Sequence, residues 1–139
     1  MGMYTLLKFD STLRADTPAR VIETLRRMLN PECPRETDVW PDHPLFHTER
    51  YWVMLKMSSA YFDEPTQSTL RKNDDGSWRL EVQCNFKNYD DEIRHFVDWI
   101  MPYTTEPDGT ELGYHRYEEY DENTPIVKCS GSQLSNEQP

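Results

Sequence analysis

The chain has few cysteines and few glycines, the residues that mark disulfide frameworks, zinc clusters and phosphate-binding loops. It contains three cysteines and five glycines in 139 residues. Cys33, Cys84 and Cys129 show no CxxC spacing, so they predict neither a disulfide framework nor a zinc cluster. So few glycines leave little material for a loop that cradles phosphate groups. We therefore expect no cofactor and no bound metal.

Long apolar runs and basic residues are scarce as well. No stretch approaches the roughly 20 apolar residues that a membrane-spanning helix needs, and no signal-peptide pattern is visible. A cytoplasmic protein is the expectation. Lys and Arg total 15 against 25 Asp and Glu, a net charge of −10. Binding to nucleic acid or to an anionic membrane surface uses basic patches, so this balance argues against both.

The acidic excess lies in the second part of the chain. Residues 1–60 carry eight acidic and eight basic residues, whereas residues 61–139 carry seventeen acidic and seven basic ones. A one-sided charge of this kind favours a partner with a basic protein surface, although it also serves solubility.

Two helices are predicted from apolar residues at helical spacing. The first follows Thr17, a plausible N-cap, and Pro18, which suits a first helical position. Its buried stripe comprises Val21, Ile22, Leu25, Met28 and Leu29. The second follows Asn88, another plausible cap, with Asp90, Asp91 and Glu92 in its first turn. Its buried stripe comprises Ile93, Phe96, Val97 and Ile100.

Alternating or continuous apolar patterns predict six strands, with a glycine turn at Gly76 and an acidic turn at 121–123. The strands are 3–9, 51–57, 66–72, 78–86, 112–120 and 125–129. Cys84 lies on the apolar face of its strand, which predicts an inert core thiol. A proline-rich loop over 31–49 separates the first helix from the second strand, with Trp40, Leu45 and Phe46 as its expected anchors.

The element order β-α-β-β-β-α-β-β predicts an α+β fold in one domain over residues 1–129. Two helices on one face of a mostly antiparallel sheet, a two-layer sandwich, would bury both apolar stripes. The pattern is ferredoxin-like in broad outline, with an extra hairpin. Residues 130–139 are expected to form a mobile polar tail.

Tyrosines and acids interleave on the predicted C-terminal hairpin. Tyrosine gives rigid contact area with a polar tip, which protein interfaces favour. Tyrosine also suits any strand, and acids also protect a sheet edge from aggregation. Weighing these, we predict a partner-binding surface made of Tyr114, Tyr117, Glu118, Glu119, Tyr120, Asp121 and Glu122.

The histidines give weaker signals. His43 and His47 have a spacing that suits two metal ligands on a helix, but Pro44 between them argues against a regular helix there. Asp91, His95 and Asp98 share one face of the second helix, where they would form either an acid–base unit or an ordinary solvated face. No nucleophile or phosphate-binding motif accompanies them.

Two classes of function follow. The first is a small acidic protein-binding module, an inhibitor or adaptor of a basic, nucleic-acid-handling protein, of the kind that a phage or mobile element encodes. The alternative is a small-ligand-binding domain or enzyme that uses His43, His47, His95 and His115, with the 31–49 loop as a lid. We favour the binder over the enzyme. An exposed terminal strand would also allow a homodimer.

Overall fold

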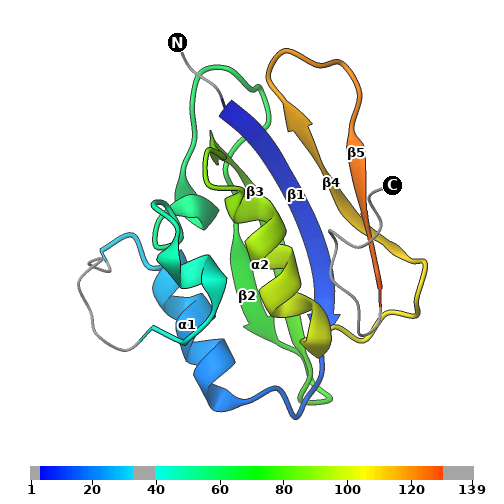
Figure 1. The fold of residues 1–139 in the computed structure, drawn as a ribbon. Helices are drawn as coiled ribbons and strands as arrows, with labels where there is room; N and C mark the ends of the chain where they lie inside the picture. Colours follow the sequence, from blue (N-terminus) through cyan, green and yellow to red (C-terminus); the bar gives the residue numbers. More distant parts are fainter. Residues whose placement is uncertain (1–3, 33–39, 130–139) are drawn as a thin grey trace.

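A five-stranded antiparallel sheet carries two helices on one of its faces (Figure 1). The computed structural model describes residues 4–32 and 40–129. The strand order is β2-β3-β1-β4-β5. The strands are β1 (Tyr4–Leu13), β2 (Thr69–Lys72), β3 (Trp78–Lys87), β4 (Glu111–Tyr117) and β5 (Thr124–Val127). The helices are α1 (Ala19–Leu29) and α2 (Glu92–Ile100). The predicted α+β class with a two-layer arrangement is confirmed.

The long central strands β1 and β3 alternate as the sequence pattern predicts. Leu7 pairs with Cys84 and Phe9 with Val82, and all four side chains are fully buried under the helices. The opposite face of the sheet, which we call the polar face, carries the alternate residues, such as Arg79 and Glu81. Burial raises the pKa of the Cys84 thiol, so the prediction of an inert core thiol holds.

Both predicted helical stripes are buried, except that Leu29 at the end of the first is only half-buried. Val21, Ile22, Leu25 and Met28 of α1 lie in the core, as do Ile93, Phe96, Val97 and Ile100 of α2. The predicted caps are wrong in position. Thr17 donates its hydroxyl to the Arg14 carbonyl and Pro18 precedes the helix. Asp91 precedes α2 with a left-handed φ of 59°, while the Asn88 side chain accepts the N–H of Ile93.

Residues 51–57 do not form the predicted strand. They make turns followed by a short 3-10 helix, η2 (Met54–Lys56), which packs against α1 and β3. Tyr51, Met54 and Leu55 are buried there. An apolar run on both faces is compatible with a buried strand or a buried helical segment, and the sequence pattern does not separate them. The element order is therefore β-α-β-β-α-β-β, one strand fewer than predicted.

The segment 57–66, which we call the crossing segment, runs over the polar face of the sheet as far as β4 and returns, since the Thr66 hydroxyl donates to the Met57 carbonyl. It begins where the Asn85 N–H donates to the Met57 carbonyl, and the Ser59 hydroxyl then donates to the Asn85 side chain at 2.5 Å. Arg116 of β4 lies over the Phe62 ring and pairs with Glu64 at 3.0 Å. Leu6, between Asn85 and Arg116 in register, is consequently fully buried outside the main core.

The predicted C-terminal hairpin is present with a longer turn. β4 ends at Tyr117 rather than Tyr120, and β5 begins at Thr124. Gly113 sits at a bulge in this pair, and a Cβ there would lie 1.9 Å from the Lys8 carbonyl oxygen. The sheet therefore requires glycine at this position.

The 31–49 loop is anchored as predicted. Leu45 and Phe46 lie buried on a 3-10 helix, η1 (Pro44–His47). Trp40 stacks on Phe46 with ring centroids 5.8 Å apart and meets Tyr51 edge-on at 4.9 Å. Residues 33–39 and the predicted tail 130–139 lie outside the described residues. Within residues 4–32 and 40–129, no helix combines the length and apolarity of a membrane span.

Candidate protein-binding surface

Exposed tyrosines gather at one end of the sheet. Among the described residues, the most exposed large apolar side chains are Tyr120 (65% exposed), Tyr89 (55%) and Tyr61 (54%). They come from the β4–β5 turn, the segment after β3 and the crossing segment. All lie where β1 begins and where β3 and β4 end, at the top of Figure 1. We call this region, with the half-buried Tyr4 and Tyr117, the tyrosine end.

The rings of the tyrosine end are held in place by contacts with other rings and with a cation. Tyr4 stacks on Tyr61 with ring centroids 5.3 Å apart, and Tyr117 meets Tyr120 edge-on at 5.4 Å. The Arg50 guanidinium lies 5.0 Å from the Tyr89 ring centroid. Such contacts reduce the rotamer freedom that binding would otherwise remove, so the exposed rings are pre-organised. A surface hollow of about 320 Å³ lies among Thr5, Asn88, Tyr89 and Tyr117.

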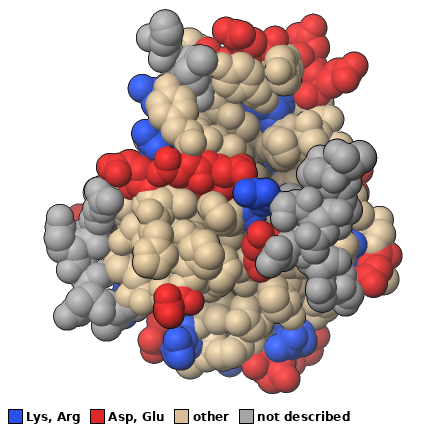
Figure 2. All heavy atoms as spheres, in the orientation of Figure 1, with Lys and Arg blue, Asp and Glu red and all other residues tan. Residues whose placement is uncertain are grey.

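Three carboxylates that form no ion pair with a described residue lie beside Tyr120, whereas Lys87 lies over the rings of Tyr4 and Tyr89. Glu119, Asp121 and Glu122 are exposed in the β4–β5 turn, and none of them forms an ion pair with another described residue. Together with Tyr120 they line a shallow hollow of about 400 Å³. Figure 2 shows acidic side chains gathered at the same end of the molecule.

The cation nearest the turn along β4 is already engaged. Arg116 pairs with Glu64 at 3.0 Å and donates to the Asn123 side chain at 2.9 Å. The hydrogen bond from Arg116 lowers the pKa of the Glu64 carboxyl. Partial burial, with the carboxylates of Glu119 and Glu118, raises the pKa of the Tyr117 phenol. The local field at the turn is therefore negative.

The structure brings together five of the seven residues predicted for the partner-binding surface and sets two apart. Tyr117, Glu119, Tyr120, Asp121 and Glu122 lie together at the turn. The carboxylate of Glu118 instead accepts the Tyr4 N–H at 2.6 Å, which fastens the start of β1. Tyr114 pairs with Lys8 and Pro125 in the sheet. It lies three residues before Tyr117 on the same strand, so its side chain is on the opposite face of the sheet, the polar face.

Three tyrosines of the tyrosine end were not predicted as binding residues from the sequence. Tyr4, Tyr61 and Tyr89 are distant in the chain, and they become neighbours only through the antiparallel register of β1 with β3 and the path of the crossing segment. No motif spacing signals this. The sequence places Tyr4 near the start of a predicted strand, and Tyr61 and Tyr89 four and three residues after the ends of two others.

The four histidines do not assemble into one site, although His43 lies near enough to His95 and Asp98 for their charges to act on its pKa. His43 lines a groove on the helix face together with Asp42, and burial lowers its pKa. His47 is 74% exposed and lies 4.0 Å from Asp42. His115 is on β4, where burial lowers its pKa, and His95 is on α2. In the part of the chain that the structure describes, no group of three ligand-type side chains could hold a metal ion.

Of the predicted face of Asp91, His95 and Asp98, the first residue is tied to a neighbour on α2, and Glu92 beside it is tied to Arg50. Asp91 pairs with Arg94 at 3.1 Å. Glu92 is fully buried, and its carboxylate accepts the backbone and side-chain N–H groups of Arg50 at 3.1 and 3.3 Å. These acids therefore stabilise the start of α2 and its contact with the loop before η2.

No protein-family model, curated protein or solved structure matches this chain.

Proposed function

We propose that this chain is a small acidic binding module whose tyrosine end docks on a basic surface of a protein partner. The observation that carries the proposal is the coincidence, at one end of the sheet, of three exposed tyrosines with three carboxylates that form no ion pair with another described residue. Exposed aromatic rings supply the apolar contact that interfaces concentrate at their centre. The acids around them steer a basic partner into place.

The chemistry of the partner follows from the charge. Carboxylates on a projecting turn resemble the phosphates of a nucleic-acid backbone in sign and density, and a basic groove that binds nucleic acid would accept them. We infer that the partner is a nucleic-acid-handling protein and that the chain acts as its inhibitor or adaptor. A phage or mobile element, acting in the host cytoplasm, is the source that this role suggests.

We also infer a ferredoxin-like topology for the scaffold, with an extra hairpin. The order β1-α1-β2-β3-α2-β4 is that of two split β-α-β units, and β5 extends the sheet at the β4 edge. In this arrangement the acidic β4–β5 turn and β5 are extra to the ferredoxin-like elements. Function belongs to such additions rather than to the frame itself.

A pair of charge-reversed baits tests the proposed function. The first carries Glu119→Lys, Asp121→Lys and Glu122→Lys. The matched control carries Glu23→Lys, Asp74→Lys and Glu111→Lys, which are exposed acids elsewhere. Each bait and the unaltered protein are used to capture partners from the native cytoplasm at low and at high salt, and captured proteins are identified by mass spectrometry.

The proposal predicts one basic partner that the unaltered protein and the control bait retain at low salt and that high salt removes. Reversal of three interface charges should weaken its binding by roughly 30-fold or more. The free energy of unfolding of the turn variant should stay within about 0.5 kcal/mol of the original, since these side chains are exposed. Equal capture by both charge-reversed baits would contradict the proposal.

A further inference from the structure

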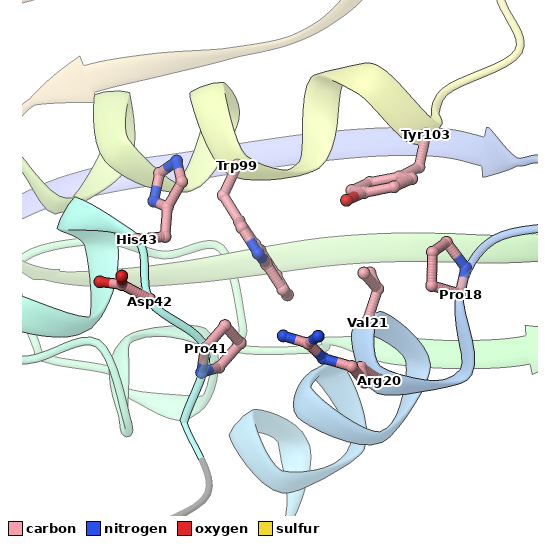
Figure 3. A pocket seen from close by; sticks show the side chains of 8 residues that line it. All are labelled: Pro18, Arg20, Val21, Pro41, Asp42, His43, Trp99 and Tyr103. Carbon is pink, nitrogen blue, oxygen red and sulfur yellow. The ribbon is translucent and has the colours of Figure 1, made fainter.

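A groove on the helix face lies away from the tyrosine end. It has a volume of about 300 Å³ and is formed by three segments: the start of α1, the end of α2 with the residues just after it, and the loop before η1. Its lining residues are Pro18, Arg20, Val21, Pro41, Asp42, His43, Trp99 and Tyr103 (Figure 3). This volume is at the lower end of the range for small-molecule sites.

Three hydrogen-bond donors of the groove have no hydrogen-bond acceptor among the described residues. Trp99 is 6% exposed, yet its indole N–H forms no hydrogen bond with any described residue. The Tyr103 hydroxyl and the Arg20 guanidinium likewise have no such partner among the described residues. Among the described residues, the buried side-chain atoms without a partner are Asp10 Oδ1, Asn85 Nδ2 and Arg94 Nε, so the Trp99 N–H is open to solvent and accessible to a ligand that carries an acceptor. In Figure 3 the Tyr103 hydroxyl and the Arg20 guanidinium both point toward the space around the Trp99 ring.

Apart from the Asp42 carboxylate at the rim, the rest of the groove is apolar or neutral. Pro18, Val21 and Pro41 form its apolar walls (Figure 3). The His43 Nδ1 atom accepts the Leu45 N–H at 3.0 Å, and burial lowers the pKa of the ring, so it is uncharged near neutral pH. Asp42 is fully exposed at the rim, and Figure 3 shows its carboxylate turned away from Arg20. The groove therefore offers donors and one cation to an acceptor.

We propose that this groove binds a small organic carboxylate with a flat apolar body. An arginine fork matches the two oxygens of a carboxylate. The indole N–H and the phenolic O–H would donate to the same anion or to a neighbouring oxygen. The first turn of α1 adds the positive end of its helix dipole, which favours an anion there. A single arginine suits a monoanion better than a doubly charged phosphate.

The test compares three ligands of one shape and different charge. Benzoate, benzamide and benzylamine are titrated into the ¹⁵N-labelled full chain, and the four tryptophan indole N–H signals are followed by NMR. Trp99→Phe assigns the Trp99 signal. Arg20→Gln removes the cation of the groove. Arg26→Gln is the matched control on the same helix, because Arg26 lies over Trp78 outside the groove.

Benzoate is expected to shift the Trp99 signal and to bind about tenfold more tightly than benzamide, with benzylamine weakest. Arg20→Gln should abolish the preference for benzoate, while Arg26→Gln leaves it unchanged. Three results would each overturn the assignment: no shift of the Trp99 signal by benzoate at millimolar concentration, equal binding of the three ligands, or an unchanged preference in Arg20→Gln. Both arginine variants remove one exposed charge from α1, so a change in stability alone cannot produce the expected difference.

Discussion

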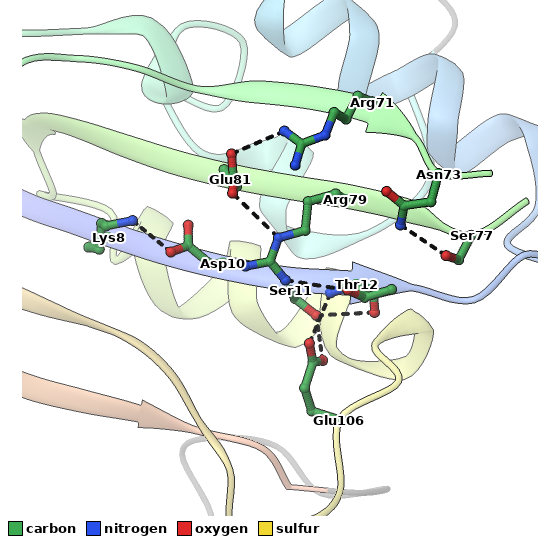
Figure 4. A network of polar contacts seen from close by, with 10 residues as sticks. All are labelled: Lys8, Asp10, Ser11, Thr12, Arg71, Asn73, Ser77, Arg79, Glu81 and Glu106. Atoms are coloured by element: carbon green, nitrogen blue, oxygen red, sulfur yellow. Dashed lines mark hydrogen bonds and ion pairs between the residues drawn. The ribbon is translucent and has the colours of Figure 1, made fainter. Parts of the chain in front are cut away.

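The polar face of the sheet and the tyrosine end both carry charged side chains, but they differ in whether those side chains form ion pairs. On the polar face the charges have partners (Figure 4). Lys8 pairs with Asp10 at 2.6 Å, and Glu81 lies 3.5 Å from both Arg71 and Arg79. At the β4–β5 turn, Glu119, Asp121 and Glu122 have no cation among the described residues. Acids that hold the fold together are paired, and acids that stand alone on a pre-organised turn are available to another molecule.

The largest effect of losing a paired acid is expected at Glu92. Its buried carboxylate accepts three N–H groups, two of Arg50 and the backbone N–H of Asp90. Glu92→Ala should lower the free energy of unfolding by about 2–4 kcal/mol, because it removes a buried carboxylate and leaves three partly buried donors without their acceptor. Urea denaturation monitored by circular dichroism measures this. A loss below about 1 kcal/mol would break the distinction between paired and unpaired acids.

Glu106 should give the next largest effect. Its carboxylate accepts the hydroxyl of Ser11 at 2.7 Å and the backbone N–H of Thr12 at 2.9 Å, and Ser11 is fully buried. Glu106→Ala should cost about 1–3 kcal/mol of unfolding free energy. Ser11→Ala in the same background should then cost little more, since the two side chains share one hydrogen bond. Full additivity in this double-mutant cycle would contradict the pairing.

A smaller, pH-dependent effect is expected at Glu64, at the boundary between the two regions. Arg116 lowers the folded-state pKa of Glu64 below its ordinary value of 4.5. The unfolded chain therefore binds a proton first as the pH falls, so the stabilisation is present above pH 4.5 and is lost below it. Glu64→Gln should cost roughly 0.5–1 kcal/mol near pH 6, because the pair is partly exposed. The difference from the unaltered protein should shrink on acidification; a constant difference down to pH 3 would be the contrary result.

Periodicity explains which parts of the fold were predictable. The helix stripes and the alternation of β3 were correct because each buries one face, which fixes the period. Residues 51–57 were predicted wrongly as a strand because their apolar side chains show no single buried face. Leu6 and Asn85 are buried by the crossing segment, whose sequence gives no sign of its path over the sheet.

The site was predictable only where it is local in sequence. Tyr117, Glu119, Tyr120, Asp121 and Glu122 fall in one stretch, so composition could point to them. Glu118 has the same chemistry as Glu119, and only the pairing of the strand ends shows that it fastens Tyr4. The register of β1 with β3 brings in Tyr89, and the sequence alone does not set that register.

The central claim is that the tyrosine end is the binding surface, and one affinity comparison tests it most directly. The captured partner is titrated with the unaltered protein, with Tyr120→Ala and with Tyr114→Ala. Tyr120 is exposed at the turn, whereas Tyr114 stands on the polar face. We predict that Tyr120→Ala weakens binding by roughly 30-fold or more, as loss of an aromatic anchor does, while Tyr114→Ala changes it by less than about threefold. Equal losses for the two variants, or a loss confined to Tyr114→Ala, would contradict the account.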